Sequence, residues 1–156
     1  MLNEDDIQES ARKLLRLGII LFLLGLITGF LLPLTANPRM ALSSHLEGVM
    51  NGLFLLILGL IWHRLAIGHL ARRVAFGLGV FGTFTNWATT LAAAFLGAGE
   101  SMMPFAAAGH TGSSGQELLI SIGLVSLSVS MVAVSGIVAW GLRPVSYTHL
   151  RAHETR

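Results

Sequence analysis

Three long stretches of the chain contain no Asp, Glu, Lys or Arg. They are 22, 26 and 25 residues long and cover residues 17–38, 74–99 and 118–142. A helix needs about 20 apolar residues to cross the hydrocarbon layer of a bilayer, so each stretch predicts one membrane-spanning helix. A fourth uncharged stretch, residues 48–63, holds only 16 residues. The helix that contains it must begin near Ala41 and carry Glu47 in its first turns.

These stretches predict an all-α fold, an integral membrane four-helix bundle formed by residues 1–144. We expect the spans at about 16–34, 42–63, 72–97 and 117–141. Charged residues make up only 12% of the chain, against roughly 25% in a typical soluble domain. The absence of cysteine excludes disulfides and thiolate metal sites. A net charge of +2 also provides no dense basic face for nucleic acid.

The positive charges gather on one side of the predicted bundle. Those on this side are Arg12, Lys13, Arg16, Arg64, Arg72, Arg73 and Arg143. The two loops on the opposite side contain only Arg39. Because loops rich in Lys and Arg remain in the cytoplasm, we expect both termini to be cytoplasmic.

The end of the chain differs from everything before it. Residues 145–156 (VSYTHLRAHETR) are polar and do not continue the pattern of the spans. We expect a non-native or disordered tail there, and its two histidines are left out of the candidate site.

Small residues recur at helical spacing in the predicted spans. Gly25 and Gly29 form one pair of small residues four apart, and Gly48 and Gly52 form another. Lipid gives apolar side chains little reason to associate, so such pairs usually allow close helix packing. Four helices enclose little volume alone, and any sizeable cavity would need neighbouring subunits. We therefore expect a homo-oligomer in the lipid bilayer.

Four polar side chains within the spans are not explained by packing. His45, Glu47, Asn51 and Asn86 all fall in the middle of the bundle or in its outer half. Polar groups inside a bilayer are costly to insert and usually mark functional sites. Glu47 and Asn51 are four residues apart and share a helix face. Glu47 could pair with Arg39, accept a hydrogen bond from Asn51, or relay a proton.

His45 allows two interpretations. It follows Ser43 and Ser44 and could simply lie at the membrane interface where a helix starts. It could instead be the axial ligand of a metal or haem, with Gly48 and Gly52 leaving bare backbone where a flat ring could lie. The sequence has no cysteine and no cluster of carboxylates and histidines, which argues against a non-haem metal site.

The loop before the last span is unusually apolar. It contains Met102, Met103, Pro104 and Phe105 between glycine-rich segments. Methionine provides an adaptable apolar wall. This segment could therefore fold back as a lid over the outer mouth of the bundle.

Several motifs resemble those of the hydroxylaminobenzene mutase family. They are NPRMALSSHLEGVMNG at 37–52, GTFTNW at 82–87, GAGESMMP at 97–104 and WGLR at 140–143. The resemblance implies a small four-helix protein of the bacterial inner membrane. It also implies isomerisation of hydroxylaminobenzene to 2-aminophenol, a redox-neutral shift of the hydroxyl group from nitrogen to the ortho carbon.

A more distant resemblance is to the styrene oxide isomerases, membrane trimers that use ferric haem b. Their haem-ligating histidine and an active-site asparagine six residues later correspond to His45 and Asn51. An asparagine of their third span corresponds to Asn86. The resemblance thus implies a trimer with His45 as the haem ligand. Two positions depart from that family: Gly82 replaces an aspartate and Thr90 a tyrosine.

Together these patterns predict an intramembrane isomerase that acts on a small aromatic N-aryl hydroxylamine. Asn51, Asn86 and Glu47 are the candidate catalytic residues. His45, Gly48 and Gly52 are the candidate haem-binding residues, with His45 as the iron ligand. Three alternatives remain: a non-catalytic membrane scaffold, a transporter of apolar solutes with Glu47 as its proton site, and an epoxide isomerase.

Overall fold

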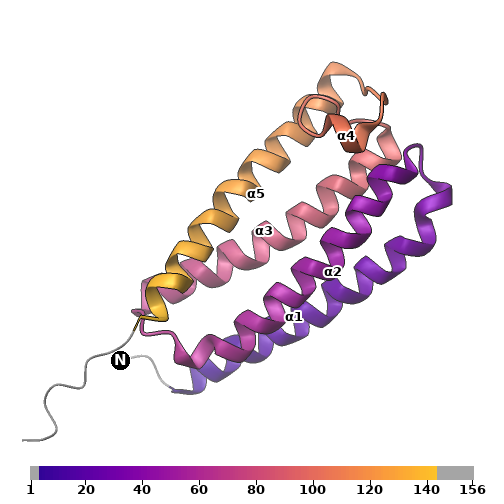
Figure 1. Cartoon of the computed structure of the whole chain (residues 1–156). Coiled ribbons are helices and arrows are strands. Elements are labelled where there is room, and N and C mark those ends of the chain that lie inside the picture. Colours follow the sequence, from indigo (N-terminus) through magenta and orange to yellow (C-terminus); the bar gives the residue numbers. More distant parts are fainter. Residues whose placement is uncertain (1–3, 144–156) are drawn as a thin grey trace, which may run out of the picture.

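The chain folds into long antiparallel helices without a strand in residues 4–143, the part that this computed structural model describes (Figure 1). The long helices are α1 (Glu4–Leu31), α2 (Pro38–Ile61), α3 (His69–Leu96) and α5 (Ser114–Gly141). The short elements are the 3-10 turns η1 (Leu32–Leu34) and η2 (Trp62–Arg64) and the helix α4 (Pro104–Ala107). The expected tail at 145–156 lies outside the described residues.

Each expected span overlaps one long helix over most of its length, but every helix begins earlier than expected, and α1, α2 and α3 end one to three residues before the expected end. The largest difference is at α1, which begins at Glu4 with Asp5 and Asp6 in its first turn. Acidic groups there stabilise the positive end of the helix dipole. Asn37 caps α2, with Pro38 in the first turn. The charged residues on either side of each uncharged stretch thus indicated where the apolar segment ends, not where the helix ends.

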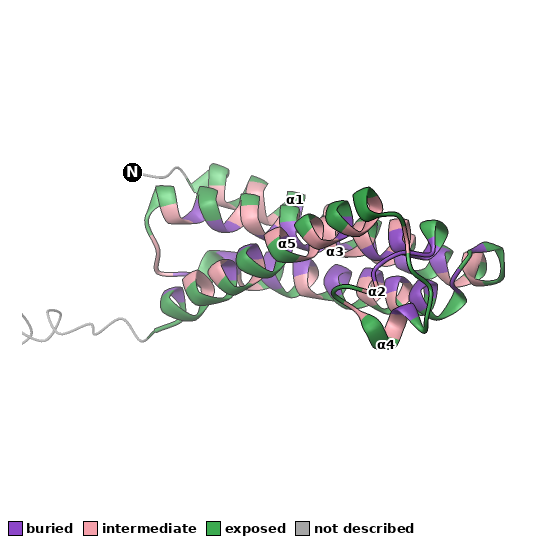
Figure 2. Cartoon of the chain, turned by 90° about the horizontal axis from the view of Figure 1, so that it is seen from above, coloured by how far each residue is buried: buried purple, intermediate pink, exposed green. Residues whose placement is uncertain are grey.

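The apolar outer surface identifies a membrane protein. Three helical segments are long and apolar enough to span a bilayer, namely Glu4–Leu34, Pro38–Arg64 and Ser114–Gly141. α3 is as long as α1 but contains more Ala and Thr, and it is not among the three. Figure 2 shows exposed residues along the outer faces of the helices. Among them, Phe30 is 82% exposed and Val132 is 75% exposed, which suits contact with lipid rather than water.

The long helices pack in chain order, α1 on α2, α2 on α3, and α3 on α5 (Figure 1). α5 packs chiefly on α3, although its Val134 side chain also reaches the core beside Leu55 and Leu58 of α2. Because α2 lies between α1 and α3, each of its two sides faces a different neighbour. Side chains two residues apart on α2 can therefore lie in different environments.

Glycines allow α1 and α2 to touch through their backbones. A Cβ atom at Gly48 would lie 2.5 Å from Gly25 Cα. A Cβ atom at Gly52 would lie 2.6 Å from Phe22 N and 2.8 Å from Gly18 O. No side chain fits at these distances, so the packing role expected for these glycines is confirmed.

Candidate functional site

A carboxylate and two amides meet between α2 and α3. Glu47 Oε2 accepts a hydrogen bond from Asn51 Nδ2 at 3.3 Å and another from Asn86 Nδ2 at 2.5 Å. Asn51 is buried, whereas Glu47 and Asn86 are half-buried. We call these three residues the polar cluster. The cluster brings together all three residues that the sequence suggested as catalytic.

The neighbours of Asn86 fix its position opposite Glu47. Ser44 Oγ donates to the carbonyl oxygen of Trp87 at 3.1 Å, which ties α2 to α3. Trp87 Nε1 donates to Thr28 Oγ1 at 3.0 Å, which ties α3 to α1. Because Trp87 is held from both sides, the turn of α3 that carries Asn86 is fixed relative to α2. A site in which groups keep fixed positions favours orientation of a bound substrate.

Three oxygen atoms of the polar cluster accept no hydrogen bond from a described residue. Glu47 Oε1, Asn51 Oδ1 and Asn86 Oδ1 form no hydrogen bond with another described residue. Glu47 also forms no ion pair with Arg39, although both are described. Carboxylate and amide oxygens can accept from N–H and O–H groups. The cluster can therefore accept hydrogen bonds from a polar ligand and take up a proton.

His45 lies on the other side of α2 and faces α1. Its Nδ1 lies 2.8 Å from the carbonyl oxygen of Gly25, and a Cβ atom at Gly29 would lie 3.1 Å from the same nitrogen. A carbonyl oxygen only accepts, so we assign the proton to Nδ1. This leaves the lone pair on Nε2, and the half-buried ring forms no other described hydrogen bond.

His45 is therefore not part of the polar cluster within one chain. Helix positions 45 and 47 point about 200° apart, because successive residues differ by about 100°. Glu47 turns toward α3 and His45 toward α1. The structure thus joins three of the four polar residues that the sequence suggested and places the fourth on a separate face of α2.

Gly48 and Gly52 contact α1 rather than open space. Besides Gly25, a Cβ atom at Gly48 would meet Trp87 Cδ1 at 2.9 Å, and Gly52 packs against Phe22 and Gly18. Helix packing within the chain is enough to account for glycine at both positions. The expected role of these two residues as haem contacts stays a prediction.

The histidine fits the role of a single axial ligand. Metal-ligating histidines usually donate their other ring N–H to a carbonyl or carboxylate, which fixes the tautomer. The bond from His45 Nδ1 to Gly25 has this form and would leave Nε2 as the nitrogen that binds a metal. No group of three His, Cys, Asp or Glu side chains among residues 4–143 could hold a metal ion without a prosthetic group.

The described pockets lie at the end of the molecule where α1 begins and α5 ends. Their volumes are about 420, 520 and 460 Å³. They are lined by residues of the N-terminal part of α1, the turn between α2 and α3, the first turns of α3, and the last turns of α5. None of the three is lined by the polar cluster or by His45.

Two residues that organise the loop between α3 and α5 were missed by the sequence analysis. The Glu117 carboxylate accepts from the backbone N–H groups of Gly99 at 2.8 Å, Gly112 at 3.0 Å and Ser101 at 3.1 Å. Asn37 Nδ2 donates to the carbonyl oxygens of residues 106 and 107. The Asn-Pro pair at the start of α2 was the available signal for Asn37, whereas nothing local indicated the role of Glu117.

The loop follows the expected lid only in part. Met103 packs against the buried cluster around Met40 and Ala98, as expected for a segment that folds back. Met102 is 46% exposed and Phe105 is 86% exposed, so these two side chains point away from the bundle. The loop therefore packs on this end of α2 and α3 through Met103, Ala106 and Ala107 rather than through Met102 and Phe105.

Replacing Glu117 with glutamine should loosen this loop. A neutral amide loses the charge-assisted bonds and offers an N–H group where the backbone also offers N–H groups. We expect amide hydrogen exchange at Gly99, Ser101 and Gly112 to become about tenfold faster or more, since one lost bond to a charged group weakens local stability by about 1.5–3 kcal/mol. Glu9→Gln is the matched control. Unchanged exchange in Glu117→Gln would contradict this role.

Comparison with known proteins places these observations in a family. The family model described as styrene oxide isomerase matches residues 10–143. Hydroxylaminobenzene mutase HabB from Ectopseudomonas oleovorans is 62% identical over 133 residues, covering 85% of this chain and 81% of that protein. Hydroxylaminobenzene mutase HabA from the same organism is 39% identical over 125 residues, covering 80% and 93%. No solved structure gives a significant match.

Proposed function

Because the chain belongs to the styrene oxide isomerase family and is an isomerase, we propose that it moves a hydroxyl group within an N-aryl hydroxylamine. The substrate class is that of hydroxylaminobenzene, and the product is the corresponding 2-aminophenol. The observation that carries the proposal is the 62% identity to a hydroxylaminobenzene mutase over most of both chains. The polar cluster supplies the groups that this reaction needs.

The reaction is balanced without an oxidant or reductant. The N–O bond breaks, a C–O bond forms at the ortho carbon, the ortho proton leaves and the nitrogen gains a proton. Restoring the aromatic ring requires a base at the ring carbon. Glu47 is that base, since Asn51 and Asn86 occupy its Oε2 and leave Oε1 available. Glu47 then returns the proton to the nitrogen.

The two asparagines orient the substrate. Their Nδ2 groups hold Glu47, and their Oδ1 atoms accept from the N–H and O–H of the hydroxylamine. The apolar surroundings keep bulk water away from the electrophilic ring during the shift. Apolar aromatic substrates reach the cluster sideways from the lipid bilayer, because the helices expose apolar surfaces there.

His45 holds a ferric haem b through Nε2 in this proposal. When bound, the haem supplies a Lewis acid that stabilises negative charge on the departing oxygen. Support comes from the Gly25 carbonyl, which fixes the Nδ1–H tautomer of His45, and from the half-buried ring. His45 and the polar cluster face opposite sides of α2, so this arrangement requires a neighbouring subunit to complete the site.

We further propose a multi-pass homo-oligomer, a trimer, in the bacterial inner membrane. All four long helices cross the bilayer, and both termini face the cytoplasm. The strongly exposed apolar faces of α1 and α5 support burial in lipid and between subunits. The Lys and Arg residues at the end where α1 begins support the orientation.

Turnover of hydroxylaminobenzene by the purified chain tests the proposed function. The protein, with any bound cofactor retained, is placed in lipid vesicles, and 2-aminophenol is measured by chromatography. We expect stoichiometric conversion, with empty vesicles as the control. Unchanged hydroxylaminobenzene in the presence of folded protein would refute the substrate assignment.

Epoxide isomerisation is the second candidate, because the matching family model is described by that activity. Gly82 packs against Met131 of α5, and Thr90 Oγ1 donates to the carbonyl oxygen of Asn86. Neither position supplies the acid or phenol found in that family. We therefore expect styrene oxide to be converted at least about tenfold more slowly than hydroxylaminobenzene, since each lost polar contact in a transition state costs about this factor or more. Faster conversion of the epoxide would reverse the assignment.

The absorption spectrum of the purified protein tests the haem assignment separately. We expect a Soret band in the native chain and in His110→Ala, and its loss in His45→Ala, because only His45 is the ligand. If 2-aminophenol forms without any bound haem, the cofactor assignment is wrong while the isomerase assignment stands. A Soret band that persists in His45→Ala would show that another residue holds the haem.

A further inference from the structure

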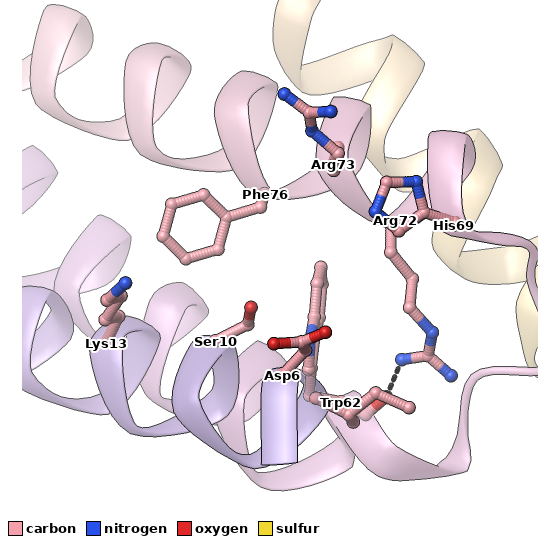
Figure 3. A pocket seen from close by; sticks show the side chains of 9 residues that line it. Asp6, Ser10, Lys13, Trp62, His69, Arg72, Arg73 and Phe76 are labelled. Atoms are coloured by element: carbon pink, nitrogen blue, oxygen red, sulfur yellow. Dashed lines mark hydrogen bonds between the residues drawn. The ribbon is translucent and has the colours of Figure 1, made fainter. Parts of the chain in front are cut away.

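A pocket of about 420 Å³ lies between the start of α1 and the start of α3, far along the helices from the polar cluster. Figure 3 shows that two helices line this pocket, with the Trp62 indole between them. The side chains from α1 are Asp6, Ser10 and Lys13. Those from α3 are His69, Arg72, Arg73 and Phe76. The pocket lining contains three positively charged side chains, Lys13, Arg72 and Arg73, and one carboxylate, Asp6. The proposed isomerase mechanism does not use this pocket.

Two buried N–H groups at this pocket have no hydrogen-bond partner among the described residues. They are Trp62 Nε1 and Arg72 Nε. Trp62 is only 1% exposed and Arg72 only 8% exposed, and both line the pocket. Buried donors in proteins are nearly always paired, and an unpaired one costs about 1–3 kcal/mol. These two donors therefore indicate an acceptor that comes from outside the chain.

The guanidinium of Arg72 lies 5.8 Å from the centre of the Trp62 ring but has no carboxylate partner among the described residues. Its Nη1 donates to the carbonyl oxygen of Trp62 at 2.6 Å and its Nη2 to that of Leu65 at 2.5 Å. Both acceptors are neutral, and Arg72 forms no ion pair with a described carboxylate. A buried charge normally has an opposite charge nearby. The missing partner of Arg72 is an anion.

The surroundings add further positive charge. Arg73 and His69 are exposed at the rim, and Gly68 caps α3 without a side-chain hydrogen bond, so the positive end of this long helix is open. Glu9 pairs with Lys13 at 2.6 Å, and Asp6 is exposed, so neither carboxylate neutralises the buried Arg72. Basic pockets between helices at the cytoplasmic face suit anionic lipid headgroups.

We propose that this pocket binds a phosphate group, with Arg72, Arg73 and the Trp62 Nε1–H as its donors. The phosphate belongs to the headgroup of an anionic lipid or to a free phosphate ion. A phosphate accepts several hydrogen bonds at once and brings the negative charge that Arg72 lacks. Binding at this place would also hold the start of α1 against the start of α3.

Lipid binding to the purified full chain tests the proposal. Native mass spectrometry measures binding of phosphatidylglycerol and phosphatidylcholine to the native chain and to Arg73→Gln, Trp62→Phe and Arg64→Gln. Arg64 is exposed at the same end but does not line the pocket, which makes it the matched control. We expect phosphatidylglycerol affinity to fall about fivefold in Arg73→Gln and in Trp62→Phe, and to stay unchanged in Arg64→Gln.

Competition with inorganic phosphate distinguishes a lipid headgroup from a free phosphate ion as the ligand of the pocket. If inorganic phosphate displaces phosphatidylglycerol at constant ionic strength, the pocket accepts the free ion as well. If phosphatidylglycerol remains bound, the lipid headgroup is the ligand. Equal binding of both lipids without phosphate binding would overturn the proposal, as would an equal loss in Arg64→Gln and Arg73→Gln. Should Trp62→Phe fail to fold, Arg73→Gln decides the outcome alone.

Discussion

Replacing Glu47 with glutamine is expected to lower kcat for 2-aminophenol formation by at least about 100-fold, because general-base catalysis typically contributes 10²–10⁴. Glutamine keeps the size of the side chain and can still form a hydrogen bond with an asparagine of the cluster. It cannot take the ortho proton, so restoration of the aromatic ring becomes slow. Substrate binding should change less, and KM should remain within a few-fold of the native value.

Glu9→Gln is the control for Glu47→Gln, since Glu9 is an exposed carboxylate on α1 that pairs with Lys13. Steady-state kinetics on both variants in vesicles give kcat and KM separately. Loss of kcat in Glu47→Gln alone supports the proton role. Native kcat in a folded Glu47→Gln protein would remove Glu47 from the mechanism and leave the carboxylate as a packing group for the two asparagines.

Replacing Gly48 with alanine is expected to have the largest effect on stability. The added methyl group would lie 2.5 Å from Gly25 Cα and 2.9 Å from Trp87 Cδ1, and the first of these neighbours is backbone. Backbone cannot rotate away, so α1 and α2 must separate. Overpacking of this kind typically costs about 1–3 kcal/mol and sometimes more. We expect a loss of about 3 kcal/mol in the free energy of unfolding, or failure to fold.

Gly136→Ala makes the same chemical change where the structure has room. A Cβ atom at Gly136 would meet nothing within 4 Å. We expect unfolding of this variant in mild detergent to match the native protein within about 1 kcal/mol, the range of the helix propensity difference between Gly and Ala. Equal stability of the Gly48 and Gly136 variants would show that α1 and α2 do not pack through Gly25 and Gly48.

Much of the helical architecture could be predicted from the sequence because a bilayer imposes strict lengths. The uncharged stretches predicted where each long helix would lie, and three helical segments meet the length and composition needed to span a membrane. The hydrogen bond between Glu47 and Asn51 was one of the alternatives that the sequence left open for Glu47, and their spacing of four residues made it possible. These properties depend on residues that are close together in the chain, so the amino-acid sequence alone was enough to indicate them.

Contacts between distant segments could not be predicted in the same way. The position of Asn86 opposite Glu47 depends on the register between α2 and α3, which Ser44 and Trp87 set. The placement of His45 toward Gly25 depends on which side of α2 the first helix occupies. The sequence predicted that the glycines at 48 and 52 pack against a helix, but not which one, because their partners on α1 lie more than 20 residues away.

The oxygen isotope content of the product is the most direct test of the proposed intramembrane isomerase. The purified chain in vesicles converts hydroxylaminobenzene in water enriched in ¹⁸O, and mass spectrometry measures the label in 2-aminophenol. A hydroxyl group that moves within one molecule at a water-poor site retains its own oxygen, so we expect unlabelled product. Product that carries ¹⁸O would mean that water attacks the ring, which would contradict the proposed hydroxyl shift.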